Sequence, residues 1–260
     1  MLSFGMSSGA KPADLRATLA TEEASHLPAS VSRNLTFGML DTLGREIVTG
    51  FYDDIRFPTE AELAQQHGVS RSVTREAVKM LTAKGLLTAR PRKGTTVQPA
   101  SSWNLFDPDV LRWLLERKFS LELLRQFSEL RIAIEPAAAA LAARNGDEAA
   151  IERVAVGFRR MEEAEQLGGD DVLEADIAFH VAVLEASGNP FYLQFRDVVS
   201  TALRTSIRFT NSFEGRTASL PAHRAVLTAI EARKPERARA AMTTIIAEVM
   251  TLVTEAEKGG

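Results

Sequence analysis

Two pairs of side chains have residue types and a spacing that suit binding chemistry. Arg71 and Arg75 lie four positions apart, as do Asp176 and His180. In a helix, this spacing places both members of a pair on one face. The two arginines suit the base edges or phosphates of duplex DNA. A carboxylate beside an imidazole suits a divalent metal ion such as zinc, nickel, manganese or iron.

The carboxylate and imidazole pair lies in the segment LEADIAFHVAVLEAS, whose other positions are mostly apolar. A third candidate ligand, His223, lies in SLPAHRAVLTAIEA, which a helical bundle can bring across to the first segment. The same spacing also fits a simple buried hydrogen bond between Asp176 and His180, with His223 unrelated to them. The residues alone leave both interpretations open.

The basic pair follows a pattern that predicts two short helices joined by a tight turn. Thr59 and Glu62 form a capping-box pattern that begins the first helix, and Ser70 is a suitable N-cap for the second. Gly68 allows the backbone to turn between them. The positions expected to pack inward are Ala61, Leu63 and Ala64 on the first helix and Val73, Ala77, Val78 and Leu81 on the second.

Positive charge is concentrated on the second helix and directly after it. Residues 71–93 contain seven Lys or Arg and one acid. Two short strands, LLTAR and TTVQP, follow and are joined by PRKG, where Gly94 permits a sharp turn and Lys93 can reach a phosphate or the minor groove. A helix with one apolar side and one basic side suits the major groove, although an ordinary solvated helix has the same composition.

Composition places the chain among globular proteins with one large domain or two smaller ones. Its 260 residues include no cysteine, which excludes disulfides and zinc-thiolate sites. No apolar run has the length of a membrane span and no signal-peptide pattern is present, so we expect a cytoplasmic protein without a membrane partner. Residues 33–99 hold ten basic and seven acidic residues, whereas residues 100–260 hold nineteen and twenty-four. A basic head on an acidic body fits a protein that presents one end to DNA.

The expected fold is mainly α. We interpret residues 1–33 as a mobile tail, residues 34–99 as a winged helix-turn-helix domain and residues 100–107 as a linker. Residues 108–257 show helical periodicity almost throughout and predict an antiparallel, all-helical bundle whose faces suit either a core or a dimer interface. The expected helices are 35–48 in the first domain and 120–144, 148–167, 171–186, 190–212, 218–233 and 235–256 in the bundle.

Residues 35–98 resemble the GntR family of bacterial transcription regulators. The family pattern is matched by Pro58, Glu60, Leu63-Ala64, Val69-Ser70-Arg71, Arg75-Glu76-Ala77, Leu81, Gly85-Leu86 and Gly94. The resemblance implies that Ser70, Arg71, Ser72 and Arg75 contact DNA and that Gly94, at the tip of the wing, enters the minor groove. Some relatives have a DNA-reading arginine where this chain has Ala61, so that contact should be absent.

Residues 107–256 resemble the FCD ligand-binding domain, which follows this head in one large subfamily. The matching residues are Arg131 with Glu135, Asp176 with Phe179-His180, Ser187-Gly188-Asn189-Pro190, and His223 with Ala229-Ile230. In that family an Asp and three His bind a divalent metal, and a small carboxylate ligand lies against the metal and an Arg. Asp176, His180 and His223 match three of the ligands. Ile245 replaces the fourth, which implies either a more open metal site or a site without metal.

The candidate effector-binding residues are Arg131, Glu135, Asn189 and Arg204. Arginine is the side chain best suited to hold a carboxylate through two parallel hydrogen bonds. Arg204 lies among further arginines and hydroxyls in segment 190–212, a face that suits either a cavity for a polyhydroxy acid or plain exposure to solvent. The stretch SWNLFDPDVLRWLLE resembles the joint between the domains in repressors of galactonate and related sugar-acid catabolism.

Together these patterns predict a ligand-responsive transcription regulator and not an enzyme. We expect a repressor that binds operator DNA as a homodimer and is released by a sugar acid, either an aldonate or a uronate. Two alternatives are a metal-dependent enzyme that uses Asp176, His180 and His223, and a DNA-binding dimer without an effector.

Overall fold

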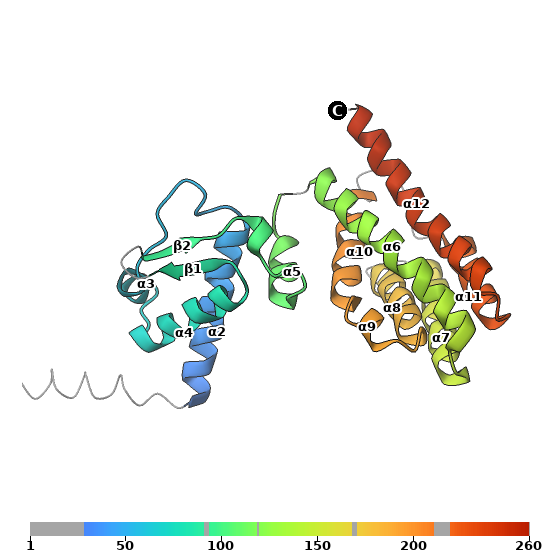
Figure 1. Cartoon of the computed structure of the whole chain (residues 1–260), viewed down its shortest axis with the longest axis horizontal. Coiled ribbons are helices and arrows are strands. Elements are labelled where there is room, and N and C mark those ends of the chain that lie inside the picture. Colours follow the sequence, from blue (N-terminus) through green and yellow to red (C-terminus); the bar gives the residue numbers. More distant parts are fainter. Residues whose placement is uncertain (1–28, 91–93, 119, 168–170, 211–218, 260) are drawn as a thin grey trace, which may run out of the picture. The chain divides into compact units, whose positions relative to one another are not determined.

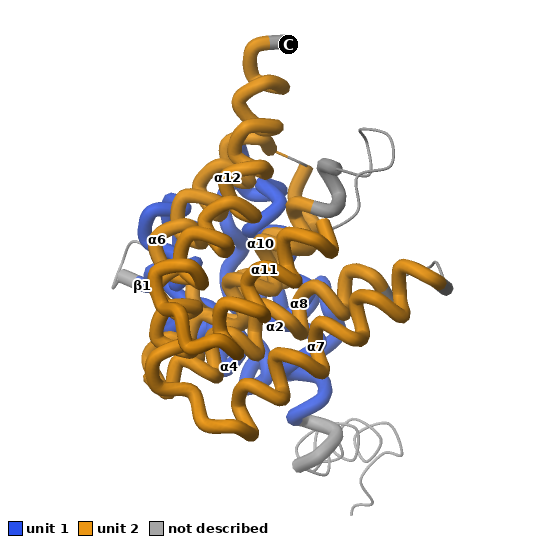
Figure 2. The backbone as a smooth tube through the Cα atoms, turned by 90° about the vertical axis from the view of Figure 1, so that its right-hand side faces the viewer, with its two compact units in different colours: residues 1–104 blue, residues 105–260 orange. Residues whose placement is uncertain are grey.

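The chain divides into two compact units, residues 1–104 (unit 1) and residues 105–260 (unit 2), as Figure 2 shows. The computed structural model describes residues 29–90, 94–118, 120–167, 171–210 and 219–259. The boundary between the units falls inside the segment 100–107 that the sequence suggests as a linker. Within the described ranges, no helix has both the length and the apolar character that crossing a membrane requires.

In unit 1, the described residues form a helix-turn-helix followed by a two-stranded wing (Figure 1). Both α2 and α3 pack against α4. The two strands pair in antiparallel fashion, with Leu87 opposite Val97 and Arg90 opposite Gly94. The elements are α2 (Ala29–Val48), α3 (Glu60–Gln66), α4 (Arg71–Ala83), β1 (Leu87–Arg90), β2 (Gly94–Val97) and the 3-10 turn η1 (Ala100–Ser102).

Local hydrogen bonds fix where α3 and α4 begin. The predicted capping box is present, because Glu62 N donates to Thr59 Oγ1 at 3.3 Å and Thr59 N donates to Glu62 Oε2 at 2.7 Å. Ser70 caps α4 by accepting a hydrogen bond from Val73 N at 3.3 Å. Gly68 has a φ of 62°, in the left-handed region that glycine tolerates, so the chain can turn between the two helices.

The prediction of which residues pack inward is correct for α4 but only partly correct for α3. On α4 all four predicted residues are buried. On α3 the prediction is wrong for Ala61, which is exposed, and Ala64 is half-buried, while Leu63 is fully buried. A helix of seven residues has so few turns that one large side chain supplies most of its buried face.

Helix α2 begins at Ala29, before the predicted start at residue 35, so residues 29–33 of the predicted tail are helical. The prediction was too short because this first turn, ASVSRN, contains few apolar residues to show a helical period. The rest of the predicted tail, residues 1–28, lies outside the described residues.

Unit 2 is an all-helical bundle in its described part (Figure 1). The long helix α6 packs against α12 and α8, α8 packs against α7 and α10, and α11 packs against α12 and α7. The helices are α5 (Pro108–Leu114), α6 (Leu121–Asn145), α7 (Glu148–Leu167), α8 (Asp171–Ala186), α9 (Pro190–Leu193), α10 (Arg196–Thr210), α11 (Leu220–Glu231) and α12 (Pro235–Gly259).

One predicted helix, 190–212, is divided into α9 and α10. Gln194 N and Phe195 N donate to the carbonyls of Phe191 and Tyr192, three residues earlier. These tighter bonds end the first short helix before α10 begins at Arg196. By contrast, α6 continues through Pro136 to Asn145.

Close packing between α7 and α8 sets the orientation of α8. At Gly157 an added Cβ would lie 2.9 Å from the Cα of Phe179, so only glycine allows the two backbones to approach this closely. The ring of Phe179 is fully buried and contacts the ring of Phe158, with centroids 6.3 Å apart. The same ring also contacts His223 of α11, with centroids 5.1 Å apart, while His180 contacts Glu135 of α6 and Asp176 contacts His223.

Candidate functional site

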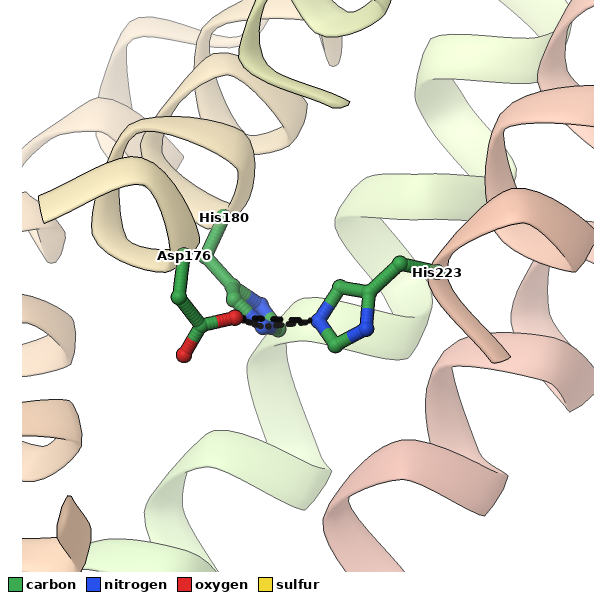
Figure 3. Close-up of side chains that lie close together, drawn as sticks. All are labelled: Asp176, His180 and His223. Carbon is green, nitrogen blue, oxygen red and sulfur yellow. Dashed lines mark hydrogen bonds and ion pairs between the residues drawn. The ribbon is translucent and has the colours of Figure 1, made fainter. Parts of the chain in front are cut away.

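Three buried side chains of unit 2 converge on one point (Figure 3). Asp176 and His180 come from α8, and His223 comes from α11. Asp176 Oδ1 lies 3.1 Å from His223 Nε2 and 3.6 Å from His180 Nε2, and the two Nε2 atoms are 3.3 Å apart. The exposed fractions are 4%, 1% and 2%, so bulk water does not reach the three donor atoms.

The Nδ1 atom of each imidazole already has a hydrogen-bond partner, which sets the tautomer that the ring takes when it carries one proton. His180 Nδ1 donates to Glu135 Oε2 at 2.5 Å, and His223 Nδ1 donates to the Ser219 carbonyl oxygen at 2.8 Å. Both acceptors lack a proton to give, so each neutral ring carries its hydrogen on Nδ1 and a lone pair on Nε2. With both rings neutral, the two lone pairs face each other and Asp176, and a proton on either Nε2 would let that ring donate to Asp176 Oδ1 instead.

This arrangement suits a proton or a metal ion among the three donor atoms. Asp176 Oδ1 accepts no hydrogen bond from the described residues. Burial alone would raise the pKa of Asp176, but the contacts with His223 and His180 and the nearby Arg131 guanidinium hold that pKa below its usual value. Three electron-rich atoms within 3.6 Å repel one another unless a proton or a metal ion lies among them.

The spacing of the donor atoms fits a metal ion. Nitrogen and oxygen ligands at 2.0–2.2 Å from a tetrahedral ion are separated by about 3.3–3.6 Å. The observed separations of 3.1, 3.3 and 3.6 Å are close to this range. Two imidazoles and one carboxylate form a donor set that suits zinc, nickel, manganese or iron. The structure thus brings together the three ligands that the sequence suggests.

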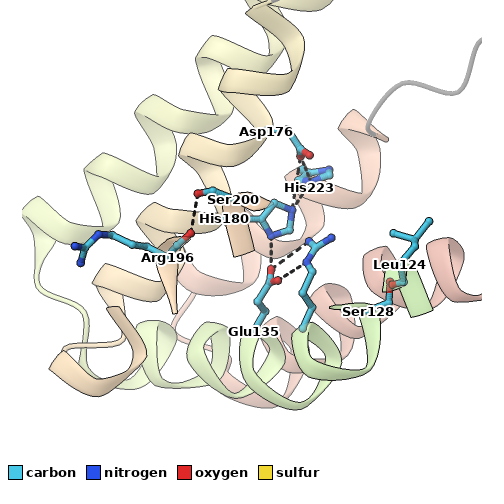
Figure 4. Close-up of polar contacts among 9 residues, drawn as sticks. Leu124, Ser128, Glu135, Asp176, His180, Arg196, Ser200 and His223 are labelled. Atoms are coloured by element: carbon cyan, nitrogen blue, oxygen red, sulfur yellow. Dashed lines mark hydrogen bonds and ion pairs between the residues drawn. The ribbon is translucent and has the colours of Figure 1, made fainter. Parts of the chain in front are cut away.

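A buried ion pair on α6, between Arg131 and Glu135, contacts the cluster at His180 (Figure 4). Arg131 Nε donates to Glu135 Oε1 at 2.5 Å, and Arg131 Nη2 lies 3.4 Å from Glu135 Oε2, the oxygen that also accepts from His180. Burial alone would raise the pKa of Glu135, but Arg131 and His180 lower it to about 2. Glu135 is therefore ionised at neutral pH. The sequence suggested Glu135 as an effector ligand, and its contact with His180 has no signal in the local pattern.

The other two predicted effector residues make contacts elsewhere. Arg204 pairs with Glu174 through two contacts of 2.5 and 3.1 Å, and both side chains are more than one-third exposed. Asn189 Oδ1 accepts from Phe191 N at 3.0 Å and caps α9. Neither residue joins the buried cluster, because Arg204 already has a carboxylate partner at the surface and Asn189 has a structural role at a helix start.

In unit 1, the predicted DNA-binding residues lie at the start of α4. Arg71, Ser72 and Arg75 are exposed, whereas the inward-facing apolar residues Val73, Ala77, Val78 and Leu81 of the same helix are buried. Arg75 Nε lies 3.5 Å from Glu60 Oε2 of α3, so the two helices share one ion pair on this surface.

The remaining predicted DNA-binding positions are Ser70, Gly94 and Lys93. Ser70 uses its hydroxyl to cap α4. Gly94 begins β2 with a φ of 79°, and Lys93 lies outside the described residues.

Both units match families of known proteins. The family described as bacterial regulatory proteins, gntR family, matches residues 51–97, and the family described as FCD domain matches residues 126–248. The galactonate operon transcriptional repressor of Escherichia coli K12 is 33% identical over 219 residues, which cover 82% of this chain and 94% of that protein. The chain belongs to the GntR family.

A further relative and a solved structure are also similar to this GntR-family regulator. The uncharacterized HTH-type transcriptional regulator YieP of Escherichia coli K12 is 34% identical over 205 residues, covering 77% of this chain and 87% of that protein. A solved structure titled "Lar controls the expression of the Listeria monocytogenes agr system and mediates virulence" has a TM-score of 0.55 and 19% identity, and it covers 85% of this chain and 96% of that one. This second likeness supports the fold alone.

The family membership decides between the classes that the sequence left open. The helix-turn-helix of unit 1 implies binding to operator DNA, and the FCD domain implies a small-molecule effector. The family and these relatives are transcription regulators, so the buried cluster belongs to a regulator and not to a metal-dependent enzyme.

Proposed function

We propose that this GntR-family regulator represses a sugar-acid catabolic operon and leaves its operator when a sugar acid binds to unit 2. The observation that carries the proposal is the buried convergence of Asp176, His180 and His223 in the domain that implies an effector. The likeness to the galactonate operon transcriptional repressor supports the sugar-acid class. In this proposal the cluster is the place where the effector is recognised.

The first part of the proposal is a divalent metal ion held by Asp176, His180 and His223, with zinc, nickel, manganese and iron as candidates. When bound, the ion supplies positive charge and a centre to which a carboxylate can coordinate. Ile245, at the position of the fourth family ligand, is buried in the apolar core of unit 2 and offers no donor atom. The chain thus supplies three ligands and leaves the remaining positions to the effector.

Three protein ligands favour an effector that brings two donors of its own. An aldonate offers a carboxylate next to a hydroxyl, and the two groups together can chelate one ion. Helix α10 packs against α8, which carries Asp176 and His180, and against α6, which carries the ion pair. Thr201, Thr205 and Ser206 are buried on α10, and such hydroxyls suit the further hydroxyls of a sugar acid.

The second part of the proposal concerns DNA. We expect α4 to enter the major groove, with Arg71, Ser72 and Arg75 toward the bases, while Lys93 and Gly94 of the wing approach the backbone or minor groove. One such head reads too few base pairs for useful specificity, so we expect a homodimer on an operator with two half-sites. By linkage, the effector and the operator weaken each other's binding by the same factor.

A thermal-shift screen combined with operator binding tests the whole proposal. The chain is stripped with a chelator and then assayed with zinc, nickel, manganese or iron(II), each with and without D-galactonate, D-gluconate or D-glucuronate. The uncharged sugar alcohol galactitol serves as the control. Support requires a metal-dependent rise in melting temperature that one acid increases, and release of operator DNA by the same acid in a gel-shift titration.

Two outcomes decide against the proposal. Intact operator binding without stabilisation by any metal or acid would favour a DNA-binding dimer that has no effector. A sugar acid that stabilises the protein equally well in the presence of chelator would remove the metal from the mechanism and leave the effector. Sedimentation velocity on the free protein tests the homodimer separately.

A further inference from the structure

The chain leaves unit 1 beside the C-terminal end of α4. Asn104, the last residue of unit 1, donates its backbone N–H to the carbonyl oxygen of Lys84 at 2.9 Å. Lys84 is the C-cap of α4. The point of exit is therefore fixed to the helix that we expect to read DNA.

Gly85, the residue after this cap, lets the same segment lie against it. A Cβ at this position would lie 2.2 Å from the carbonyl oxygen of Ser102 and 3.3 Å from the Cα of Trp103. Gly85 also has a φ of 79°, which residues with a side chain rarely adopt. Both observations favour glycine, so the backbone of Ser102 and Trp103 lies directly on the turn that follows α4.

Two further hydrogen bonds hold the other end of the segment. Trp103 Nε1 donates to the carbonyl oxygen of Gln98 at 2.9 Å, and Gln98 N donates to that of Leu86 at 2.8 Å. Residues 98–104, which we call the latch, are thus folded back onto unit 1. The predicted linker, 100–107, begins with residues that belong to this latch.

The residues that follow the latch are held to unit 2. The rings of Phe106 and Phe195 are in edge-to-face contact, with centroids 5.6 Å apart, and both residues belong to unit 2. Asp107 then caps α5. Leu105 alone separates the latch from Phe106 along the sequence, so the tether between the two units is very short.

The latch therefore limits how far unit 1 can move from unit 2. If it detached, residues 99–104 would join the tether and could extend it by roughly 20 Å, at about 3.5 Å a residue. One turn of duplex DNA is about 34 Å long. With detached latches, the DNA-binding units of a dimer could reach half-sites several base pairs further apart than the short tether allows.

We propose that the latch makes the half-site spacing of the operator a strict requirement, with Gly85 and Asn104 as the positioning residues that keep it attached. A dimer whose DNA-binding units are held on short tethers matches one spacing, and at other spacings it engages one half-site at a time. This inference rests on the homodimer of the proposed function. It needs neither a metal ion nor an effector.

Gly85→Ala detaches the latch by placing a Cβ where the backbone of Ser102 lies. The substitution also strains the backbone, because the φ of Gly85 is positive. Gly68→Ala is the matched control, since Gly68 has a similar φ of 62° and an added Cβ there has nothing within 4 Å beyond its own neighbours. It reproduces the strain and leaves the latch attached.

Asn104→Pro detaches the latch by a second route, because proline lacks the N–H that bonds to Lys84. Trp103 already has the extended backbone that a following proline requires, with a φ of −71° and a ψ of 143°. Asn104→Ala keeps the N–H and is the control for this variant. Hydrogen exchange of the peptide that covers residues 99–104 reports detachment directly and should be slow in wild-type protein and in both controls, and fast in both latch variants.

The functional assay is fluorescence anisotropy on an operator selected from random sequences with wild-type protein, and on the same duplex with about five base pairs inserted between its half-sites. The insertion turns one half-site by about half a helical turn, so wild-type protein and both controls should bind on the order of 100-fold more weakly. Gly85→Ala and Asn104→Pro should lose less than about 5-fold on insertion. They should also bind the selected operator on the order of 5-fold more weakly than wild type, because a longer tether lowers the effective concentration.

The outcomes separate this inference from the proposed function. If wild-type protein is a monomer in sedimentation velocity, or selects no sequence with two half-sites, the proposed function fails and the inference fails with it. If wild-type protein is a dimer that binds both duplexes equally, the inference alone is refuted.

The variants give two further ways to refute the inference. Slow exchange in both latch variants would show that these contacts do not hold the segment. Fast exchange together with the wild-type loss on insertion would show that the latch does not set the spacing. Should Gly85→Ala fail to fold, Asn104→Pro decides between these results.

Discussion

Replacing Arg75 with alanine should separate DNA binding from folding. The Arg75 side chain is 63% exposed, and its Nε lies 3.5 Å from Glu60 Oε2. Exposed ion pairs of this kind contribute about 0–1 kcal/mol to stability. Alanine is also a good helix former, so Arg75→Ala should change the free energy of unfolding of unit 1 by less than about 1 kcal/mol.

The expected loss in operator binding is larger. An arginine that makes two hydrogen bonds to a guanine contributes about 1–3 kcal/mol, which corresponds to roughly 5- to 150-fold in Kd. Removing Arg75 also leaves the Glu60 carboxylate without this partner on the surface that we expect to face the phosphates. The double variant Glu60→Ala/Arg75→Ala should therefore bind the operator more tightly than Arg75→Ala alone, and the difference measures the repulsion by Glu60.

The assay is fluorescence anisotropy on an operator duplex defined by selection from random sequences, repeated at several salt concentrations and beside a random duplex. Urea unfolding of the same samples checks the fold. Arg45→Ala is the matched control, since Arg45 is 45% exposed on α2 and pairs with Asp41 four residues earlier at 2.8 Å. Its operator affinity should stay within about twofold of wild type.

Two results would refute the reasoning about Arg75. Unchanged operator affinity would show that the first turns of α4 do not read DNA. The affinity for the operator and for the random duplex could instead fall by the same factor, while the slope of log affinity against log salt concentration becomes smaller by about one. That result would place Arg75 at a phosphate and not at a base.

Three further predictions concern other parts of the chain. Thr59→Ala removes the side-chain cap of α3 and should destabilise unit 1 by about 0.5–2 kcal/mol in urea unfolding; an unchanged midpoint would contradict the capping role. His223→Ala should abolish the metal-dependent rise in melting temperature, and a persisting rise would exclude His223 from the ligand set. Because the pKa of Glu135 is about 2, below its ordinary 4.5, its ionised form stabilises the fold above about pH 4.5, and this stabilisation, on the order of 3 kcal/mol, is lost as the pH falls toward 2. Urea unfolding from about pH 5 downward should show this loss in wild-type protein but not in Glu135→Gln, so parallel curves would contradict it.

Features determined by neighbouring residues could be predicted from the sequence. The capping box of Thr59 and Glu62 involves residues three apart, and the shared face of Asp176 and His180 involves residues four apart. Such spacings follow from helix geometry alone. The start of α3 and the shared face of the two candidate ligands on α8 were therefore predictable before the fold was known.

Features that depend on which helices pack together could not be predicted in this way. Glu135 and His180 are 45 positions apart, and Arg204 and Glu174 are 30 apart. No local pattern shows that one glutamate accepts from an imidazole while another neutralises a surface arginine. The break between α9 and α10 was missed for a related reason, since apolar spacing continues across it while the hydrogen bonds change to the tighter kind.

Arg131 shows why residue type alone gives an incomplete account of a buried site. An arginine facing a cavity is an obvious ligand for a carboxylate, but here the chain supplies that carboxylate itself, from Glu135 one turn along the same helix. Arg131 is therefore already paired inside unit 2, and its residue type alone does not make it a ligand for an effector.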